Sequence, residues 1–178
     1  MKPLAAFSLM DWVEAHRDQL RPPVVNATLF DDGDFIVMVV GGPNLRTDYH
    51  DDPHDELFYQ LRGSLVMRLM EARAPREIQV AAGGMFLVPA HVRHSPQRPD
   101  PDGVGLVIER RRAAGAFDGF EWFCPNCHLL LHRIEIALHD IVADLPPLFD
   151  TFYQDQAART CKRCGAIHPA PPGDLATA

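Results

Sequence analysis

Residues 46–63 read R-T-D-Y-H-D-D-P-H-D-E-L-F-Y-Q-L-R-G and place His50 and Glu56 at the start of an alternating apolar run. A second stretch, residues 83–98, reads G-G-M-F-L-V-P-A-H-V-R-H-S-P-Q-R and contributes His94. Two imidazoles and one carboxylate from neighbouring segments can bind one face of a divalent metal and leave other positions open. The two stretches therefore predict a three-ligand metal centre of the kind found in non-heme Fe(II) oxygenases.

The segments around both stretches predict a mainly β fold. Apolar and β-branched runs of four to eight residues alternate with Gly and Pro turns, and Arg62-Gly63 reads as a tight hairpin. The expected strands are 25–30, 35–40, 56–61, 64–70, 76–80, 85–88, 104–110 and 129–136. Short strands at near-regular spacing indicate an antiparallel barrel or jelly roll, whose interior lets ligands from adjacent strands converge.

Short helices flank this barrel, and the composition changes after Gly115. Ser8 is expected to cap a helix that continues to Leu20 and ends at Pro22-Pro23, and Pro146-Pro147 is expected to open a second one. We expect residues 1–115 to form the barrel with its N-terminal helix. Residues 116–168 would form a C-terminal extension that closes the barrel, and 169–178 a flexible tail.

Composition excludes some partners. The chain has 178 residues, of which 47% are hydrophobic, enough for one domain with a small appendage. A net charge of −7 argues against binding to nucleic acid. No apolar run is long enough to cross a membrane or to act as a secretory leader, so we expect a cytoplasmic protein.

Four cysteines form two identical C-x-x-C pairs, Cys124/Cys127 and Cys161/Cys164. In a reducing compartment such pairs favour a four-thiolate metal site over disulfides. Iron and zinc fit such a tetrahedral site equally well. Because four thiolates leave no open position for substrate, we expect this second metal to be structural.

Each candidate ligand has an ordinary alternative, a surface or strand-end residue, and only the combination of the three favours metal. His54 and His91 compete for the same role; we expect His54 to be a loop residue and His91 to contact a metal ligand without binding the metal itself. One of Asp51, Asp52 and Asp55 is expected to hold His50 in its metal-binding tautomer.

The first stretch resembles the first metal motif of the cupin superfamily, H-x-H-x3/4-E-x6-G. His50, Glu56 and Gly63 keep its frame, whereas Asp52 stands where the motif has a second His. The resemblance therefore implies a cupin fold whose metal has three protein ligands rather than four.

The second stretch resembles the second cupin motif, G-x5-P-x-G-x2-H-x3-N. Gly83, Pro89 and His94 match it, whereas His91 replaces the Gly and Arg98 replaces the Asn. The replacement at 98 puts a cation beside the expected metal.

Within the cupins, long runs resemble the 3-hydroxyanthranilate 3,4-dioxygenase family from about Trp12 to His168. They include R-T-D-Y-H-D-D-P, E-x-F-Y-Q-L-R-G, P-x-H-V-R-H-S-P-Q-R-P and D-G-F-E-W-F-C. The resemblance implies Fe(II) at His50, Glu56 and His94, assembly as a homodimer, and a second, rubredoxin-like site at the cysteines. It implies that 3-hydroxyanthranilate and O2 are converted to 2-amino-3-carboxymuconate semialdehyde, the precursor of quinolinate in the kynurenine pathway to NAD.

Four residues are expected to contact this substrate: Arg46, Glu56, Arg98 and Glu109. Arg98 offers a planar fork for its carboxylate; a surface loop is the alternative. Glu109 lies in an apolar run and needs a partner such as the substrate or Arg98, unless it faces outward. Arg46 is expected to stabilise the charge that dioxygen develops; an ion pair with a nearby aspartate is the alternative. Arg46 and Glu109 are the expected catalytic residues.

Three other functions stay open from the residues alone. A cupin that senses or stores a ligand would keep the metal but would consume no oxygen. A metal-dependent isomerase would work without oxygen. A zinc-ribbon module would explain the cysteines, although the acidic balance argues against nucleic acid.

Overall fold

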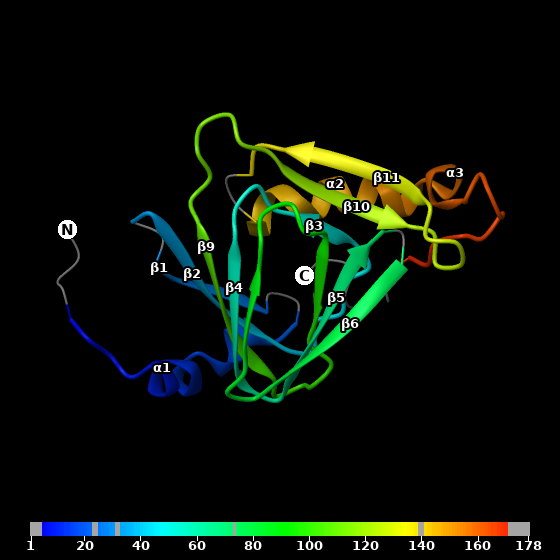
Figure 1. Cartoon of the computed structure of the whole chain (residues 1–178). Helices are drawn as coiled ribbons and strands as arrows, with labels where there is room; N and C mark the ends of the chain where they lie inside the picture. The colour runs from blue at the N-terminus through cyan, green and yellow to red at the C-terminus, as the bar shows by residue number, and fades with distance from the viewer. Residues whose placement is uncertain (1–4, 23–24, 31–32, 73, 139–140, 171–178) are drawn as a thin grey trace.

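The computed structural model describes residues 5–22, 25–30, 33–72, 74–138 and 141–170 and shows two antiparallel sheets packed against each other (Figure 1). One sheet has the order β1 (Asn26–Phe30), β2 (Phe35–Gly41), β9 (Val104–Arg110), β4 (Glu56–Arg62) and β7 (Met85–Val88). The other has the order β11 (Leu130–Ile136), β10 (Asp118–Phe123), β3 (Tyr49–Asp51), β8 (His94–Gln97), β5 (Ser64–Glu71) and β6 (Ala74–Ala81). The predicted mainly β fold of antiparallel strands with a few short helices is confirmed.

The expected strands are present, with ends that differ by at most two residues. Three further strands, β3, β8 and β10, were not predicted from the sequence. The sequences of β3 and β8, Y-H-D and H-S-P-Q, are polar, yet every residue in them is buried. Hydrophobic alternation could not reveal them, because most of their buried side chains are polar: His50 and His94 reach Glu56, and Asp51 pairs with Arg133.

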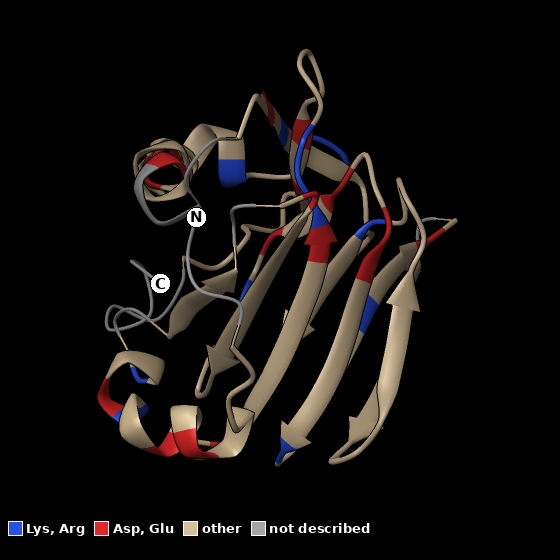
Figure 2. Cartoon of the chain, turned by 90° about the vertical axis from the view of Figure 1, so that its left-hand side faces the viewer, with Lys and Arg blue, Asp and Glu red and all other residues tan. Residues whose placement is uncertain are grey.

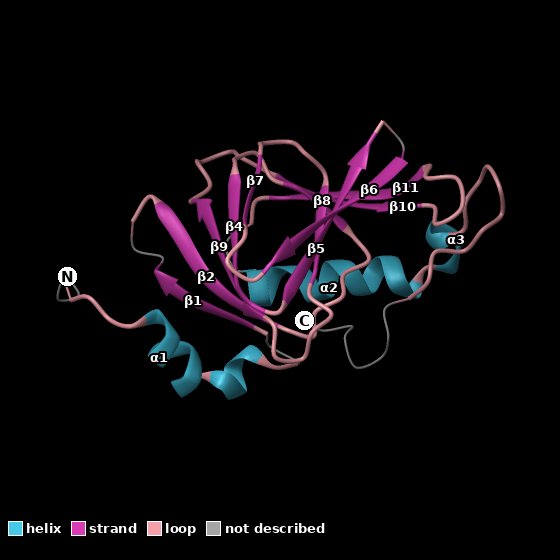
Figure 3. Cartoon of the chain, turned by 60° about the horizontal axis from the view of Figure 1, so that its bottom comes forward, coloured by secondary structure: helices cyan, strands magenta, loops and turns pink. Residues whose placement is uncertain are grey.

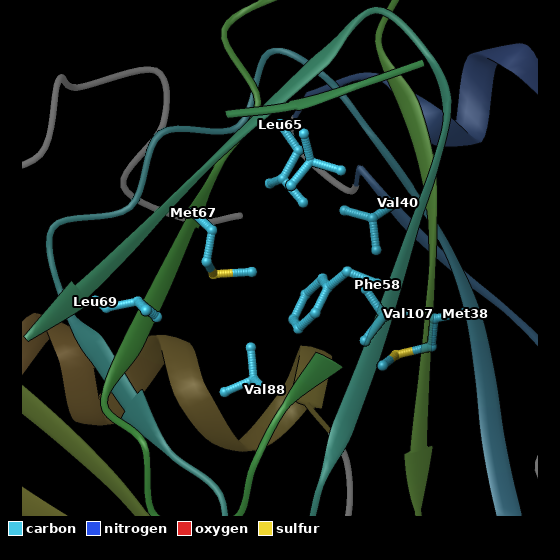
Figure 4. Packing of buried hydrophobic residues seen from close by; sticks show 9 residues of the cluster. Met38, Val40, Phe58, Leu65, Met67, Leu69, Val88 and Val107 are labelled. Atoms are coloured by element: carbon cyan, nitrogen blue, oxygen red, sulfur yellow. The ribbon is translucent and has the colours of Figure 1, made fainter. Parts of the chain in front are cut away.

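The apolar core lies between the two sheets (Figure 4). Strand β5 shows the expected alternation, since Leu65, Met67 and Leu69 are buried while its other residues are not. Phe58 of β4 and Val107 of β9 meet them from the opposite sheet. The barrel interior is therefore filled by side chains along most of its length.

The first helix is shorter than predicted (Figure 3). Ser8 caps α1 (Leu9–Ala15) as expected, accepting from the Asp11 backbone N–H at 3.3 Å. The helix ends at Ala15 and a separate 3-10 turn, η1 (Arg17–Leu20), follows. At the break the His16 ring stacks on Trp12 and hydrogen-bonds its carbonyl at 2.7 Å, which stabilises the helix end. Of the predicted Pro22-Pro23 stop, residue 23 is outside the described residues.

The second helix is longer than predicted. Helix α2 (Ile141–Gln154) begins five residues before Pro146, so the two prolines lie inside it. Packing overrides their low helix propensity, because Leu145 and Phe152 are buried against Phe120 and Trp122 of β10. A short helix, α3 (Gln156–Arg159), follows. Of the expected flexible tail, residues 171–178 lie outside the described part of the chain.

The segment after residue 115 adds strands to the barrel. β10 pairs with β3 and β11 pairs with β10, so both extend the six-stranded sheet, and α2 lies along this hairpin (Figure 1). Within the described residues, no helix has the length and apolarity to span a membrane.

We predict that Gly41→Ala destabilises the protein by about 1–3 kcal/mol, because the added Cβ overpacks a tight contact. It would lie 1.9 Å from the Leu20 carbonyl oxygen, where backbone rather than a flexible side chain must move. Gly33→Ala is the matched control: its Cβ meets nothing within 4 Å, so a change within about 0.5 kcal/mol is expected. Urea unfolding measures both, and equal stability of the two variants would contradict the close approach of η1 to β2.

Candidate metal centre

The three predicted ligands come together from both sheets. His50 of β3 and His94 of β8 are direct cross-strand partners in the six-stranded sheet. Glu56 opens β4 in the other sheet, and its carboxylate reaches between the two rings. All three side chains are buried. Figure 2 shows acidic and basic segments next to each other near the upper ends of the central strands.

The separations of the ligand atoms fit one shared ion. Glu56 Oε1 lies 2.9 Å from His50 Nδ1 and 3.2 Å from His94 Nε2. Two ligands that bind one metal at about 2.1 Å and at right angles are about 3 Å apart. Within the described part of the chain, buried Glu56 Oε1 has no well-directed hydrogen bond. A divalent cation bound by all three groups would satisfy it.

Each ring is held by the nitrogen that faces away from Glu56. His50 Nε2 donates to Asp118 Oδ1 at 2.8 Å, and His94 Nδ1 donates to the Val92 carbonyl at 2.9 Å. These bonds fix the tautomers that leave His50 Nδ1 and His94 Nε2 free as ligands.

The electrostatics of the site favour a cation. Burial lowers the pKa of His50, but the charge of Glu56 and the bond to Asp118 outweigh it and raise this pKa to about 10. Burial opposes ionisation of Glu56, yet the two imidazoles hold its pKa well below the usual value. The site therefore stabilises positive charge, whether that charge comes from a proton on the His50 ring or from a bound metal.

Neither competing histidine joins the three candidate ligands, and His91 contacts Asp51 rather than a candidate ligand. His91 is exposed and its Nδ1 lies 3.1 Å from Asp51 Oδ1, while His54 Nδ1 lies 3.6 Å from Asp52 Oδ1. Neither belongs to a group that could hold a metal within the described residues.

The expectation that Asp51, Asp52 or Asp55 holds His50 is wrong, because Asp118 does so. The pairing of β10 with β3 brings residue 118 to a ring 68 positions earlier. Spacing along the chain could not reveal this contact. The one sequence signal was the run D-G-F-E-W-F, which Asp118 opens.

Arg98 is buried, with 1% of its surface exposed, so the surface-loop alternative is excluded. In the described residues its Nε and Nη2 atoms have no hydrogen-bond partner. Burial and the nearby charge of Arg46 lower its pKa to about 10. A buried guanidinium without a partner is costly, and an anionic ligand would relieve that cost.

Arg46 forms the ion pair that sequence analysis gave as the alternative role. Its Nε and Nη2 atoms donate to the two carboxylate oxygens of buried Asp48, the first at 3.1 Å. About a quarter of the Arg46 side chain stays exposed. The ion pair fixes the direction of the guanidinium while leaving one edge open.

Glu109 is buried, so it does not face outward. It lies opposite Glu56 in the β4–β9 register, and its partner is Arg112 rather than Arg98, with Arg112 Nη1 2.9 Å from Glu109 Oε1. Burial and the charge of Glu56 raise the pKa of Glu109 to about 7. The role of Arg112 was missed, because nothing in the run R-R-R of residues 110–112 distinguishes one arginine from the next.

The four cysteines gather at the far end of the β10–β11 hairpin. Cys124 Sγ lies 3.5 Å from Cys164 Sγ, and Cys127 Sγ lies 3.6 Å from Cys161 Sγ. Four thiolates around one ion at about 2.3 Å are about 3.8 Å apart, whereas disulfide sulfurs are about 2 Å apart. The arrangement therefore fits a tetrahedral metal.

The two C-x-x-C turns have the same backbone geometry. The His128 N–H donates to the Cys124 carbonyl at 3.0 Å, and the Gly165 N–H donates to the Cys161 carbonyl at 2.9 Å. Both donors have positive φ, 56° and 73°. The paired turns thus present four sulfurs to one point from segments far apart in the sequence.

The cysteine segment also contacts the loop that carries Arg46. Tyr153 of α2 and Thr47 share a hydrogen bond between hydroxyls at 2.6 Å. His168, just after the second cysteine turn, is buried and hydrogen-bonds the Thr47 backbone. The fold of the C-terminal segment therefore influences the position of Arg46.

Comparisons with known proteins identify the family of this chain. The family model for 3-hydroxyanthranilic acid dioxygenase matches residues 1–153. A 3-hydroxyanthranilate 3,4-dioxygenase of Ruegeria pomeroyi is 52% identical over 95% of this chain and 94% of its own length. Proteins of the same name from Shewanella woodyi, 50% identical over 95% of this chain and 89% of its own, and Burkholderia lata, 53% over 92% and 94%, are similarly close. The chain belongs to the 3-hydroxyanthranilic acid dioxygenase family.

Proposed function

We propose that this protein is an Fe(II)-dependent 3-hydroxyanthranilate 3,4-dioxygenase that opens the substrate ring with O2 to form 2-amino-3-carboxymuconate semialdehyde. The observation that carries this proposal is the His50, Glu56 and His94 triad near Arg98, whose Nε and Nη2 atoms have no hydrogen-bond partner among the described residues. Membership of the family and the names of its close relatives support the same substrate.

The triad would hold Fe(II) through His50 Nδ1, Glu56 Oε1 and His94 Nε2. Bound Fe(II) would bring O2 and the electron-rich aromatic ring together and allow the electron transfer that O2 activation needs. Asp118 and the Val92 carbonyl keep the rings turned toward the ion, as described above. Glu56 is expected to contact the substrate as well, because its carboxylate faces the same space.

Arg98 would bind the substrate carboxylate. Its fork can form two parallel charge-assisted bonds, which are stronger in a buried pocket than in water. A substrate lacking the carboxylate would leave this guanidinium buried without a partner, so Arg98 would select for the acid.

Glu109 and Arg46 are the proposed catalytic residues. A carboxyl with a pKa near 7 can accept a proton from the substrate hydroxyl or amine and return it at neutral pH. Arg46, held by Asp48, would stabilise the negative charge that develops on oxygen.

Residues 116–168 would act as an extension that closes the barrel and carries a structural iron or zinc. We further propose that the protein is a homodimer in the cytoplasm, the compartment in which the tryptophan-derived route to NAD uses this reaction. The product of the reaction would be the precursor of quinolinate.

The function is tested by loading the protein with Fe(II) without oxygen and then adding 3-hydroxyanthranilate and O2. We expect near-ultraviolet absorbance of the semialdehyde and one O2 consumed per product. Reaction without oxygen would instead indicate an isomerase, and ligand binding without oxygen uptake would indicate a sensor.

His50→Ala, Glu56→Ala and His94→Ala should each abolish iron binding or turnover. His54→Ala should retain both, and loss of iron in that variant alone would contradict the ligand set.

Arg98→Ala should raise KM for 3-hydroxyanthranilate by about 100-fold, because it removes the partner of a buried carboxylate. Its preference for that acid over 2-aminophenol should shrink. Arg62→Ala is the matched control, since Arg62 pairs with Glu14 on the surface. Steady-state kinetics with both compounds give the answer, and an unchanged preference would remove Arg98 from substrate recognition.

Replacing Cys161 and Cys164 by Ser should lower Tm by about 5–10 °C, because loss of a structural metal costs several kcal/mol. Proteolysis near the C-terminal segment should speed up, while freshly iron-loaded protein keeps much of its turnover. The decisive measurement is activity per catalytic iron in the double variant. A near-total loss with that iron still bound would mean that the cysteine site takes part in the chemistry.

A further inference from the structure

Arg112 contacts three buried carboxylates that come from different parts of the fold. Its Nη2 lies 2.6 Å from Asp52 Oδ2 and 2.5 Å from Asp118 Oδ1, and its Nη1 lies 2.9 Å from Glu109 Oε1. A second bond, from Nε to Asp118 Oδ2 at 3.0 Å, makes the contact with Asp118 bidentate. The Arg112 side chain is only 8% exposed. A guanidinium held in this way is an integral part of the site rather than a surface charge.

The same carboxylates lie close enough to one another to share a metal ion. Besides the catalytic triad, two buried groups have ligand atoms that lie within 4.8 Å of one another: His50 with Asp52 and Asp118, and Asp52 with Glu56 and Glu109. Oxygen-rich clusters of this kind bind hard divalent cations such as Mn(II). The delocalised charge of Arg112 lies against every carboxylate of these groups except Glu56.

We propose that Arg112 is a built-in cation that occupies the position of a second metal ion and thereby keeps the catalytic centre mononuclear. It is a positioning residue: through Asp118 it keeps His50 Nδ1 directed at Glu56, and through Glu109 it orients the carboxylate opposite Glu56. Without it, four buried carboxylates would face one catalytic ion, and their mutual repulsion would favour a second divalent cation. The inference rests on the metal-binding triad of the proposed function.

The test counts metal ions without turnover. Protein whose cysteine site has been filled with Zn(II) is titrated anaerobically with Mn(II), which prefers oxygen and nitrogen ligands to thiolates. Calorimetry gives the number of ions, and electron paramagnetic resonance shows whether two ions are coupled. Wild type should bind one Mn(II) per chain. Arg112→Ala should bind two, with a coupled spectrum, whereas Arg112→Lys, which keeps a positive charge, should bind one.

The matched control is Arg111→Ala, because Arg111 lies next to Arg112 but its Nε donates to the Gly33 carbonyl at the surface. It should bind one ion. Guanidinium chloride at non-denaturing concentration should return Arg112→Ala to one ion, and urea, which has a similar shape and no charge, should not. Adding Asp52→Asn to Arg112→Ala should also restore one ion, because it removes a ligand of the second site.

The outcomes separate the two proposals. If wild type binds no Mn(II) at the triad, the metal centre itself is wrong. If wild type and Arg112→Ala both bind one ion, the triad stands and the role of Arg112 is wrong. Should Arg112→Ala fail to fold alone, we expect guanidinium or excess Mn(II), but not urea, to restore its circular dichroism. A variant that stays unfolded with both cations would overturn the inference.

Discussion

Four carboxylates buried close together at one end of a barrel are the constraint on which the rest of this structure depends. Asp52, Glu56, Glu109 and Asp118 repel one another in a poorly hydrated space, where that repulsion is strong. Such a cluster is stable only if cations are built around it. The guanidinium of Arg112 and the proposed metal, which His50 and His94 would help to hold, provide the positive charge. The proposed metal-binding and catalytic residues are thus also the residues that stabilise the buried charges at this end of the barrel.

The two sheets are joined by this charge arrangement as much as by the apolar core. The core residues fill the interior below the site, and the T-shaped contact of Phe58 with His94, 5.8 Å between ring centres, marks the boundary. Above it, Glu56 of one sheet reaches the two histidines of the other, and Arg112 links Glu109 to Asp118 across the same gap. The apolar core on one side of the site and the ion pairs on the other hold the ligand atoms at the separations that one ion requires.

The C-terminal segment connects two sites of different character. The cysteine turns lie away from the triad, yet Tyr153 and His168 contact Thr47, next to Arg46. A metal at the cysteines would stabilise the fold that makes these contacts, and so would affect the pocket by position rather than by chemistry. If both candidate sites hold a metal, only the one at the triad would be open to substrate.

The sequence by itself determined the β-rich barrel, the triad and the cysteine pairs, because each is encoded by residue type at fixed spacing. Leu65, Met67 and Leu69 alternate with less buried residues as in a half-buried strand. The two motif frames together predict that His50, Glu56 and His94 bind one metal. Tertiary structure alone decided the partners of these residues. Asp118 reaches His50 because β10 pairs with β3, and Arg112 reaches three carboxylates because the β9–β10 connection passes over the site. Local patterns carry no information about such contacts. His50 and Asp118 are 68 positions apart and Asp52 and Arg112 are 60 apart, and even the nearby Glu109 and Asp118 are selected as partners of Arg112 by complementary charge rather than by period.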